Sequence, residues 1–219
     1  MNIAIDGPAG AGKSTIARLA AKELGFIYVD TGAMYRAIAL YFISNDTDTD
    51  DEASLKAALD NININIVYEE GVQHVFLNLM DVSAEIRNEK VGNVASTTSA
   101  LKPVREKLLD LQRDIAAKND VIMDGRDIGT NILPNAELKI YLTASVDVRA
   151  DRRFKELKEH GENPDIEVIK KDIETRDYQD MNREIAPLKQ AEDAVYLDTS
   201  DMSISEDVDK IIELAKERR

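Results

Sequence analysis

Glycine, lysine and serine residues near the N-terminus have a spacing that binds phosphate. Gly7, Gly12, Lys13 and Ser14 occupy the fixed positions of the pattern G-x-x-x-x-G-K-[ST]. Glycines let backbone N–H groups turn inward and approach phosphate oxygens closely. In this pattern the lysine reaches the β- and γ-phosphates of a nucleotide, and the serine hydroxyl binds Mg²⁺. The pattern predicts a phosphate-binding loop (P-loop), with Lys13 as a catalytic residue and Ser14 as a metal ligand.

The segments on either side of this loop fit that prediction. Residues 2–6 are typical of a buried strand, while residues 13–24 repeat apolar side chains at helical spacing until Gly25. A helix that begins in the loop points its positive end at the bound anion. We therefore expect one continuous run of residues to bind the donor nucleotide: Gly7, Pro8, Ala9, Gly10, Ala11, Gly12, Lys13, Ser14 and Thr15.

Basic residues that follow two later strand-like segments are candidates for binding a phosphate acceptor. Arg36 and Arg126 both lie where the carboxyl edge of a parallel sheet is expected, which is where ligands bind in such folds. Each can hold a phosphate with two parallel hydrogen bonds. The alternatives are a solvated helical residue for Arg36 and a structural ion pair for Arg126. Asp30 and Asp124 lie at the same edge, and the sequence leaves open which one orders the water shell of a metal.

Three arginines share a short helical segment farther along the chain. Arg149, Arg152 and Arg153 fall within two turns, so Arg149 shares a face with one of the others. A mobile arm of this kind neutralises charge on a transferred phosphoryl group when it closes. The alternative is a solvated helix in which Asp147 and Asp151 are surface partners of the arginines.

A second helical stripe combines Arg176, Asp180 and Arg183, which are spaced by four and three residues. This spacing aligns all three on one helix face. They can satisfy one another as a salt bridge, or the arginines can bind phosphates while Asp180 binds a ribose hydroxyl. His74 and His160 have no nucleophile or metal ligand nearby in sequence, so we expect both at the surface.

The bulk composition excludes several classes of protein. The chain has no cysteine, which rules out disulfides and thiolate chemistry and agrees with a cytoplasmic location. Its net charge of −14 disfavours nucleic acid and anionic membranes as partners. No apolar run approaches the roughly 20 residues that span a bilayer, and the first residues lack the pattern of a signal peptide. An Asn-Lys-x-Asp motif is also absent, which argues against a GTPase.

Strand and helix signals alternate along most of the chain and predict an α/β fold. Apolar segments at 26–29, 120–123, 138–142 and 194–197 are separated by helical stretches, as in a parallel sheet covered on both faces. The middle differs, since isoleucines alternate with asparagines over 62–66 and a second alternation over 75–79 follows a turn. This pattern predicts an antiparallel hairpin, and we interpret about 60–95 as an inserted subdomain.

Five segments together resemble the bacterial-type cytidylate kinases, in order and spacing, over nearly the whole chain. They are IDGPAGAGKST, YVDTGAMYR, VASTTSALKPVRE, DGRDIGT and RDYQDMNREIAPL. The resemblance implies a single kinase domain over 1–219, with the three-layer sandwich of P-loop NTPases. It also implies an acceptor-binding subdomain at about 60–95 with a small antiparallel sheet, and a helical lid at about 149–163. The expected activity is transfer of the γ-phosphoryl group of ATP to CMP or dCMP with Mg²⁺, and a monomer is favoured.

The resemblance also implies roles for individual side chains. The acceptor's base and sugar would contact Thr31, Ser96, Arg105, Arg126, Asp127 and Asp180. Its phosphate would contact Arg36, Arg126, Arg176 and Arg183. Tyr35 belongs to the same acceptor site, and the expected catalytic residues are Lys13, Arg126, Arg153 and Arg176. The alternatives are a P-loop kinase with another acceptor and a regulatory module that binds ATP without transferring phosphate.

Overall fold

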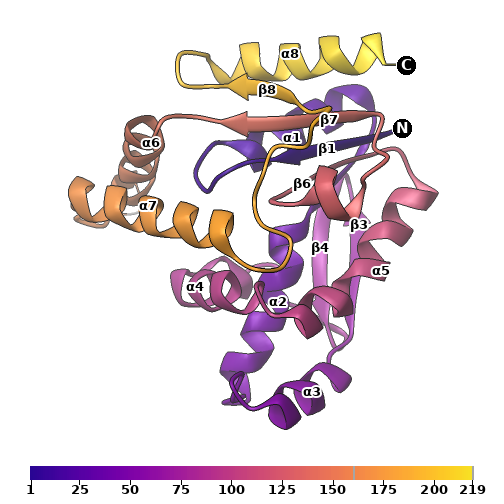
Figure 1. Cartoon of the computed structure of the whole chain (residues 1–219), viewed down its shortest axis with the longest axis vertical. Helices are drawn as coiled ribbons and strands as arrows, with labels where there is room; N and C mark the ends of the chain where they lie inside the picture. Colours follow the sequence, from indigo (N-terminus) through magenta and orange to yellow (C-terminus); the bar gives the residue numbers. More distant parts are fainter. Residues whose placement is uncertain (160, 219) are drawn as a thin grey trace.

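A parallel sheet forms the centre of the computed structural model, which describes residues 1–159 and 161–218 (Figure 1). Five strands pair within these residues, in the order β2-β6-β1-β7-β8, and every neighbouring pair is parallel. The predicted α/β fold and its strand positions are confirmed. The strands are β1 (Asn2–Asp6), β2 (Ile27–Asp30), β6 (Val121–Gly125), β7 (Leu138–Thr143) and β8 (Val195–Asp198).

Helices cover both faces of this sheet because successive side chains of each strand point to opposite sides. On one face, α1 (Lys13–Leu24) and α8 (Ile204–Glu217) pack on Ile3 and Ile5 of β1. On the other, α2 (Thr31–Ser44) and α5 (Lys102–Lys118) share a core with Ala4 of the same strand. Both cores are continuous and apolar, so the sheet holds its carboxyl edge in a fixed place.

The predicted antiparallel hairpin is also confirmed. β3 (Ile64–Glu69), β4 (Val72–Leu77) and β5 (Met80–Asp81) form a separate sheet in that order, with Glu70 and Gly71 at positive φ in the turn. The predicted alternation is wrong at Leu79, which is 93% exposed because β4 ends at Leu77. α3 (Glu52–Asp60) precedes this sheet, and η1 (Glu85–Arg87) and α4 (Glu89–Thr98) follow it.

Two charged helices pack together near the carboxyl edge of the parallel sheet, at the left of Figure 1. They are α6 (Val146–Glu159) and α7 (Ile166–Asn182), and Ala150, Ile169 and Ile173 form their shared apolar contact. The predicted lid at about 149–163 covers most of α6, and His160 lies outside the described residues. No described helix has the length and apolar character needed to cross a membrane.

The remaining histidine, which was predicted to lie at the surface, has a partly exposed side chain and a carboxylate partner. His74 lies on β4 and is only partly exposed, and its Nδ1 is 2.8 Å from Asp81 Oδ2. The antiparallel pairing of β4 with β5 brings the two side chains together.

Candidate active site

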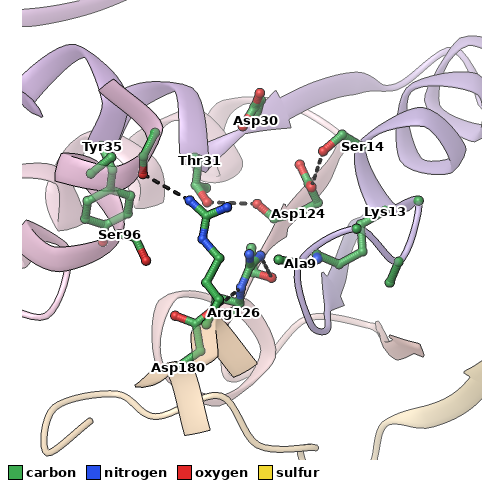
Figure 2. A pocket seen from close by; sticks show the side chains of 18 of the residues that line it. Ala9, Lys13, Ser14, Asp30, Thr31, Tyr35, Ser96, Asp124, Arg126 and Asp180 are labelled. Atoms are coloured by element: carbon green, nitrogen blue, oxygen red, sulfur yellow. Dashed lines mark hydrogen bonds and ion pairs between the residues drawn. The ribbon is translucent and has the colours of Figure 1, made fainter. Parts of the chain in front are cut away.

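A cavity of about 670 Å³ opens at the carboxyl edge of the parallel sheet. The P-loop lines one side of it, while α2, α4 and the segment after β6 line the other. Arginines of α6 and α7 complete the wall. Figure 2 shows Lys13 and Ser14 on one side of this cavity and Thr31, Tyr35 and Ser96 on the other, with Arg126 between them. The topology therefore brings together residues that lie far apart in the sequence.

The P-loop has the backbone geometry that its glycines predict. Gly12 is left-handed at φ 89° and directly precedes the first residue of α1. Gly7 lies so close to β7 that an added Cβ would be 1.9 Å from the carbonyl oxygen of Leu142. Side chains other than hydrogen are therefore excluded at Gly7. Ala9 to Thr15 line the cavity, whereas Gly7 and Pro8 lie behind that lining.

Lys13 is buried, with 5% of its surface exposed, and its Nζ donates a 2.7 Å hydrogen bond to the Pro8 carbonyl. Burial lowers the pKa of Lys13 to about 7, and repulsion from Arg126 acts in the same direction. Asp124 opposes both effects. The loop's own backbone thus holds the ammonium group beside the phosphate-binding surface.

Asp124 is the carboxylate that contacts the predicted metal ligand. Ser14 Oγ donates to Asp124 Oδ2 at 2.9 Å, and the Tyr28 hydroxyl donates to Asp124 Oδ1 at 2.9 Å. Burial raises the pKa of Asp124 to about 6, and the charge of Asp30 adds to the shift. Asp30 itself accepts from the Ala33 amide and from Arg36. Sequence reasoning missed Tyr28, although its position two residues before Asp30 puts it on the same side of the strand.

Asp127 gathers the predicted acceptor residues into one buried ionic cluster. Arg105 and Arg183 both donate to its carboxylate, the latter at 3.2 Å, and Asn131 donates at 3.0 Å. The Arg105 guanidinium also lies over the Tyr35 ring, 5.6 Å from its centroid. Buried charges are stable only when they are paired in this way. The cluster therefore presents Arg105 and Asp127 in fixed orientations at the cavity wall.

The other predicted acceptor residues line the same cavity. Arg126 Nε donates to Asp180 Oδ2 at 2.8 Å, and Thr31 Oγ1 donates to the Asp124 carbonyl at 2.8 Å. Arg36 Nη2 is 2.9 Å from Asp30, while its buried Nε has no partner within the described chain. Ser96 on α4 also faces the cavity. The prediction that these side chains meet at one cavity is thus supported by their positions.

Arg176 differs from its neighbours because no carboxylate pairs with it among the described residues. Its Nη2 donates to the Gly92 carbonyl at 3.1 Å. Burial and the nearby charge of Arg126 lower the pKa of Arg176. The alternative of a self-contained stripe on α7 is wrong, because Asp180 pairs mainly with Arg126 and lies 3.9 Å from Arg183. An unpaired guanidinium at the cavity is suited to bind an anion.

The arginines of α6 divide into anchored and exposed side chains. Arg149 is 3% exposed, makes a bidentate pair with Asp177 and donates to the Ala9 carbonyl at 2.9 Å. The solvated-helix alternative is therefore wrong for this residue. Arg152 donates to the Thr199 carbonyl at 2.8 Å, and only Arg153 remains at the surface, paired with Glu156.

Asp147 likewise departs from the solvated-helix alternative, because its partner is Lys170 of α7 at 2.8 Å and not an arginine of its own helix. Asp177 lies only one residue from the predicted Arg176, yet nothing in the sequence indicated that its partner is on α6.

Gln73 joins the antiparallel sheet to the edge of the parallel sheet. Its side chain accepts from the Asp30 amide at 2.9 Å and donates to the Asp30 carbonyl at 3.2 Å. It thus satisfies both backbone groups at the end of β2, as a neighbouring strand would. A single glutamine in a strand gives no sequence signal for such a contact.

Sequence comparisons place this geometry in a known context. A family model described as "Cytidylate kinase" matches residues 3–217. A curated cytidylate kinase from Lactobacillus johnsonii is 50% identical over 219 residues, covering 100% of this chain and 95% of that protein. One from Streptococcus pneumoniae is also 50% identical, with 100% and 98% coverage. Another from Caldicellulosiruptor saccharolyticus is 50% identical over 214 residues, with 98% and 95% coverage.

Solved structures with a similar fold have much lower sequence identity. An uncharacterized protein from Eubacterium ventriosum has a TM-score of 0.57 at 11% identity, covering 99% of this chain and 98% of that one. Shikimate kinase from Acinetobacter baumannii, in complex with shikimate, has a TM-score of 0.51 at 15% identity, with 100% and 94% coverage. At these identities the likeness concerns the fold alone, and it agrees with the P-loop kinase architecture.

Proposed function

Because the chain belongs to the cytidylate kinase family, we propose that it transfers the γ-phosphoryl group of ATP to CMP or dCMP. The products are ADP and CDP or dCDP. One observation carries the proposal: a P-loop faces a cluster of acceptor-side arginines and aspartates across a single cavity. The donor side and the acceptor side thus open into the same cavity, as direct transfer requires.

On the donor side, we assign the phosphates of ATP to the backbone of residues 7–15 and to Lys13. The N-terminus of α1 begins at this loop, so its N–H groups attract the anion. In this structure Lys13 donates to the Pro8 carbonyl. A phosphate oxygen that replaced this carbonyl would pair the ammonium group with a full negative charge.

The residues present fit a bound Mg²⁺. The ion prefers oxygen ligands and is held by one or two carboxylates together with substrate phosphates and waters. Ser14 and Asp124 meet this need, because their side-chain oxygens adjoin at the P-loop. Ser14 would bind the ion directly and Asp124 would order its water shell. When bound, Mg²⁺ neutralises charge on the β- and γ-phosphates.

On the acceptor side, we assign cytosine recognition to Ser96, Arg105 and Asp127, which can present both donors and an acceptor to a base edge. We assign a sugar hydroxyl to Asp180 and Thr31, which line the same cavity, and Tyr35 would hold Arg105 in place through its ring. The remaining assignments concern the acceptor phosphate, which would be bound by Arg36, Arg126, Arg176 and Arg183.

The reaction needs positioning and charge stabilisation more than covalent help. An oxygen of the CMP phosphate attacks the γ-phosphorus of ATP, and the bond to the β,γ-bridging oxygen breaks. ADP leaves with that electron pair, so no covalent phosphoenzyme forms. Lys13, Arg126, Arg153 and Arg176 would stabilise the charge on the transferred group.

We further propose that residues of about 60–95 and the lid at about 149–163 close over both nucleotides. Closure excludes water that would otherwise hydrolyse ATP. For Arg153, which is now exposed and paired with Glu156, closure would supply its route to the phosphates. We propose a cytoplasmic monomer without nucleic-acid or membrane partners, in keeping with a net charge of −14.

A panel of acceptors tests the proposed function. ADP release would be measured with CMP, dCMP, UMP, AMP and shikimate, with Lys13→Ala as the inactive control. We expect turnover with CMP or dCMP to exceed turnover with AMP and shikimate by at least about 100-fold. Equal ADP release without any acceptor would identify an ATPase. ATP binding without acceptor-dependent turnover would identify a regulatory module.

A further inference from the structure

Asp6 is a buried carboxylate that the proposed mechanism does not use. It is the last residue of the central strand β1, directly before Gly7, and only 5% of its surface is exposed. Oδ1 accepts from the Ile128 amide at 2.7 Å, and Oδ2 accepts from the Gly129 amide at 2.8 Å. Both carboxylate oxygens are thus committed to one short segment of backbone.

That segment directly follows two residues that are assigned to the acceptor. Ile128 and Gly129 begin the π-helical turn η2 (Ile128–Ile132), immediately after Arg126 and Asp127. A Cβ on Gly129 would lie 3.4 Å from the Asp6 carboxylate and 3.1 Å from Lys139, so the turn already packs tightly against both side chains. A displacement of this backbone would therefore move Arg126 and Asp127 as well.

The charge of Asp6 argues against a role in binding the donor. A carboxylate next to a P-loop repels the phosphates that the loop binds. Burial of this charge is tolerated because two N–H groups donate to it. An asparagine would fill the same space, but its NH₂ group would face one of the two N–H donors. The choice of an acid is thus explained by the two amides that it holds.

We propose, on the basis of the proposed function, that Asp6 is a positioning residue which fixes the segment 126–129 to the P-loop strand and thereby sets the affinity for CMP. Its ionised form accepts both hydrogen bonds, and its protonated form accepts only one well. Affinity for the acceptor consequently depends on the protonation of a group that touches neither nucleotide.

The environment of Asp6 places this dependence near neutral pH. Burial raises the pKa of Asp6 to about 6, repulsion from Asp127 raises it further, and the two amides together with Lys13 lower it. The titratable groups that interact with it are Lys13 of α1, Asp127 of the acceptor segment and Tyr141 of β7, and Lys139 of β7 packs against the same Gly129. Asp6 is therefore mainly ionised at pH 7.5 and mainly protonated at pH 5.0.

The kinetic test compares Asp6→Asn with wild type. At pH 7.5 we expect the KM for CMP to rise about tenfold, since a hydrogen bond to a charged group is lost, and the KM for ATP to stay within about twofold. At pH 5.0 the ratio of the two KM values for CMP should fall toward one, because wild-type Asp6 is then protonated. Ionisation of the CMP phosphate affects both proteins equally and cancels in the ratio.

Asp198→Asn is the matched control. Asp198 also ends a strand of the parallel sheet and accepts a backbone hydrogen bond, from the Ser200 amide at 2.9 Å, but it lies at the exposed edge. We expect no change in either KM. An equal rise of both KM values in Asp6→Asn, or no rise in the KM for CMP, would overturn the proposal.

Amide hydrogen exchange supplies a readout that needs neither the variant nor activity. In wild type without nucleotides, the protection factors of the Ile128 and Gly129 amides should fall about fivefold between pH 7.5 and pH 5.0. Those of Ile3 and Ile5 should not change. Constant protection at Ile128 and Gly129 would overturn the proposal even if Asp6→Asn fails to fold. If wild type does not phosphorylate CMP, the proposed function fails, while hydrogen exchange still tests Asp6.

Discussion

The donor side and the acceptor side of the cavity are built from different kinds of contact. Ala9 to Thr15 line the donor side as one continuous run of residues, and four of these seven are glycine or alanine, so the backbone makes up much of that surface. The acceptor side takes single side chains from α2, α4, α5, α7 and the segment after β6. Most of its arginines are already paired with carboxylates, as in the pair of Arg126 with Asp180. Backbone binding tolerates changes of side chain, whereas a network of paired charges couples ligand binding to stability.

The largest effect on activity is expected at Lys13, because it is the donor-side residue whose side chain, and not only its backbone, is assigned to the phosphates. Lys13→Ala should lower kcat roughly 1,000-fold, because a fixed charge at the transferred phosphoryl group is removed. Steady-state assays with CMP and ATP measure this change, with circular dichroism as a control for folding. A loss of less than tenfold would show that the backbone alone accounts for donor chemistry.

Two arginines on the acceptor side separate binding from stability. Arg176→Ala should lower kcat/KM for CMP about 100-fold and change the free energy of unfolding by less than about 0.5 kcal/mol, because Arg176 holds no carboxylate among the described residues. Arg183→Ala should reduce activity and also cost about 3 kcal/mol of stability, because it removes one of two cations from buried Asp127. Urea denaturation of both variants tests this contrast. Equal stability losses would contradict it.

A smaller effect concerns pH and the donor-side carboxylate Asp124. Its pKa in the folded protein is about 6, above the ordinary 3.8, so its contribution to folding becomes unfavourable as the pH rises from about 4 to 6. Asp124→Asn lacks this titration. The stability of the variant relative to wild type should therefore increase by roughly 1–3 kcal/mol between pH 4.0 and pH 7.5. Denaturation without nucleotide or Mg²⁺ measures it, and a pH-independent difference would count against a buried charge at Asp124.

The smallest effect is expected where the donor side is backbone alone. Ala9→Ser adds a small side chain to a residue whose carbonyl accepts from Arg149, and we expect kcat/KM for both nucleotides to change less than about twofold. Ser96→Ala is the acceptor-side counterpart, with a specific loss in kcat/KM for CMP. Equal responses of the two variants would erase the distinction between the two sides.

The sequence predicted the secondary-structure elements and the residues that line the cavity better than the contacts among those residues. Strong local signals explain the success: the pattern around Lys13 is continuous, and Gly25 ends the first helix at φ 70°. On the acceptor side, position and spacing singled out Arg36, Arg126, Arg176, Asp180 and Arg183, each with a structural alternative, whereas Thr31, Tyr35, Ser96, Arg105 and Asp127 came only from the resemblance to a family. Segments with weak periodicity, such as α3 and the π-helical turn after Asp127, were not predicted.

Contacts across long sequence distances could not be predicted, because periodicity carries no information about partners. Arg149 was expected on a mobile arm or, in the alternative, on a solvated helix, yet its partner Asp177 lies 28 residues away on another helix. The same is true of Asp6, which contacts amides more than 120 residues away. Burial of these charges depends on the packing of α6, α7 and η2, which only the folded chain specifies.

Gln73 limits how the antiparallel sheet can be exchanged between enzymes. Its carboxamide satisfies the amide and the carbonyl of Asp30, so a deletion of that sheet leaves both groups at the end of β2 to water. The same aspartate fastens Arg36, which extends the disturbance to the acceptor side. A shortened enzyme therefore needs another side chain at this place. Chimeras that cross over between residues 31 and 72 preserve the contact only when the incoming sequence carries a carboxamide in the position of Gln73.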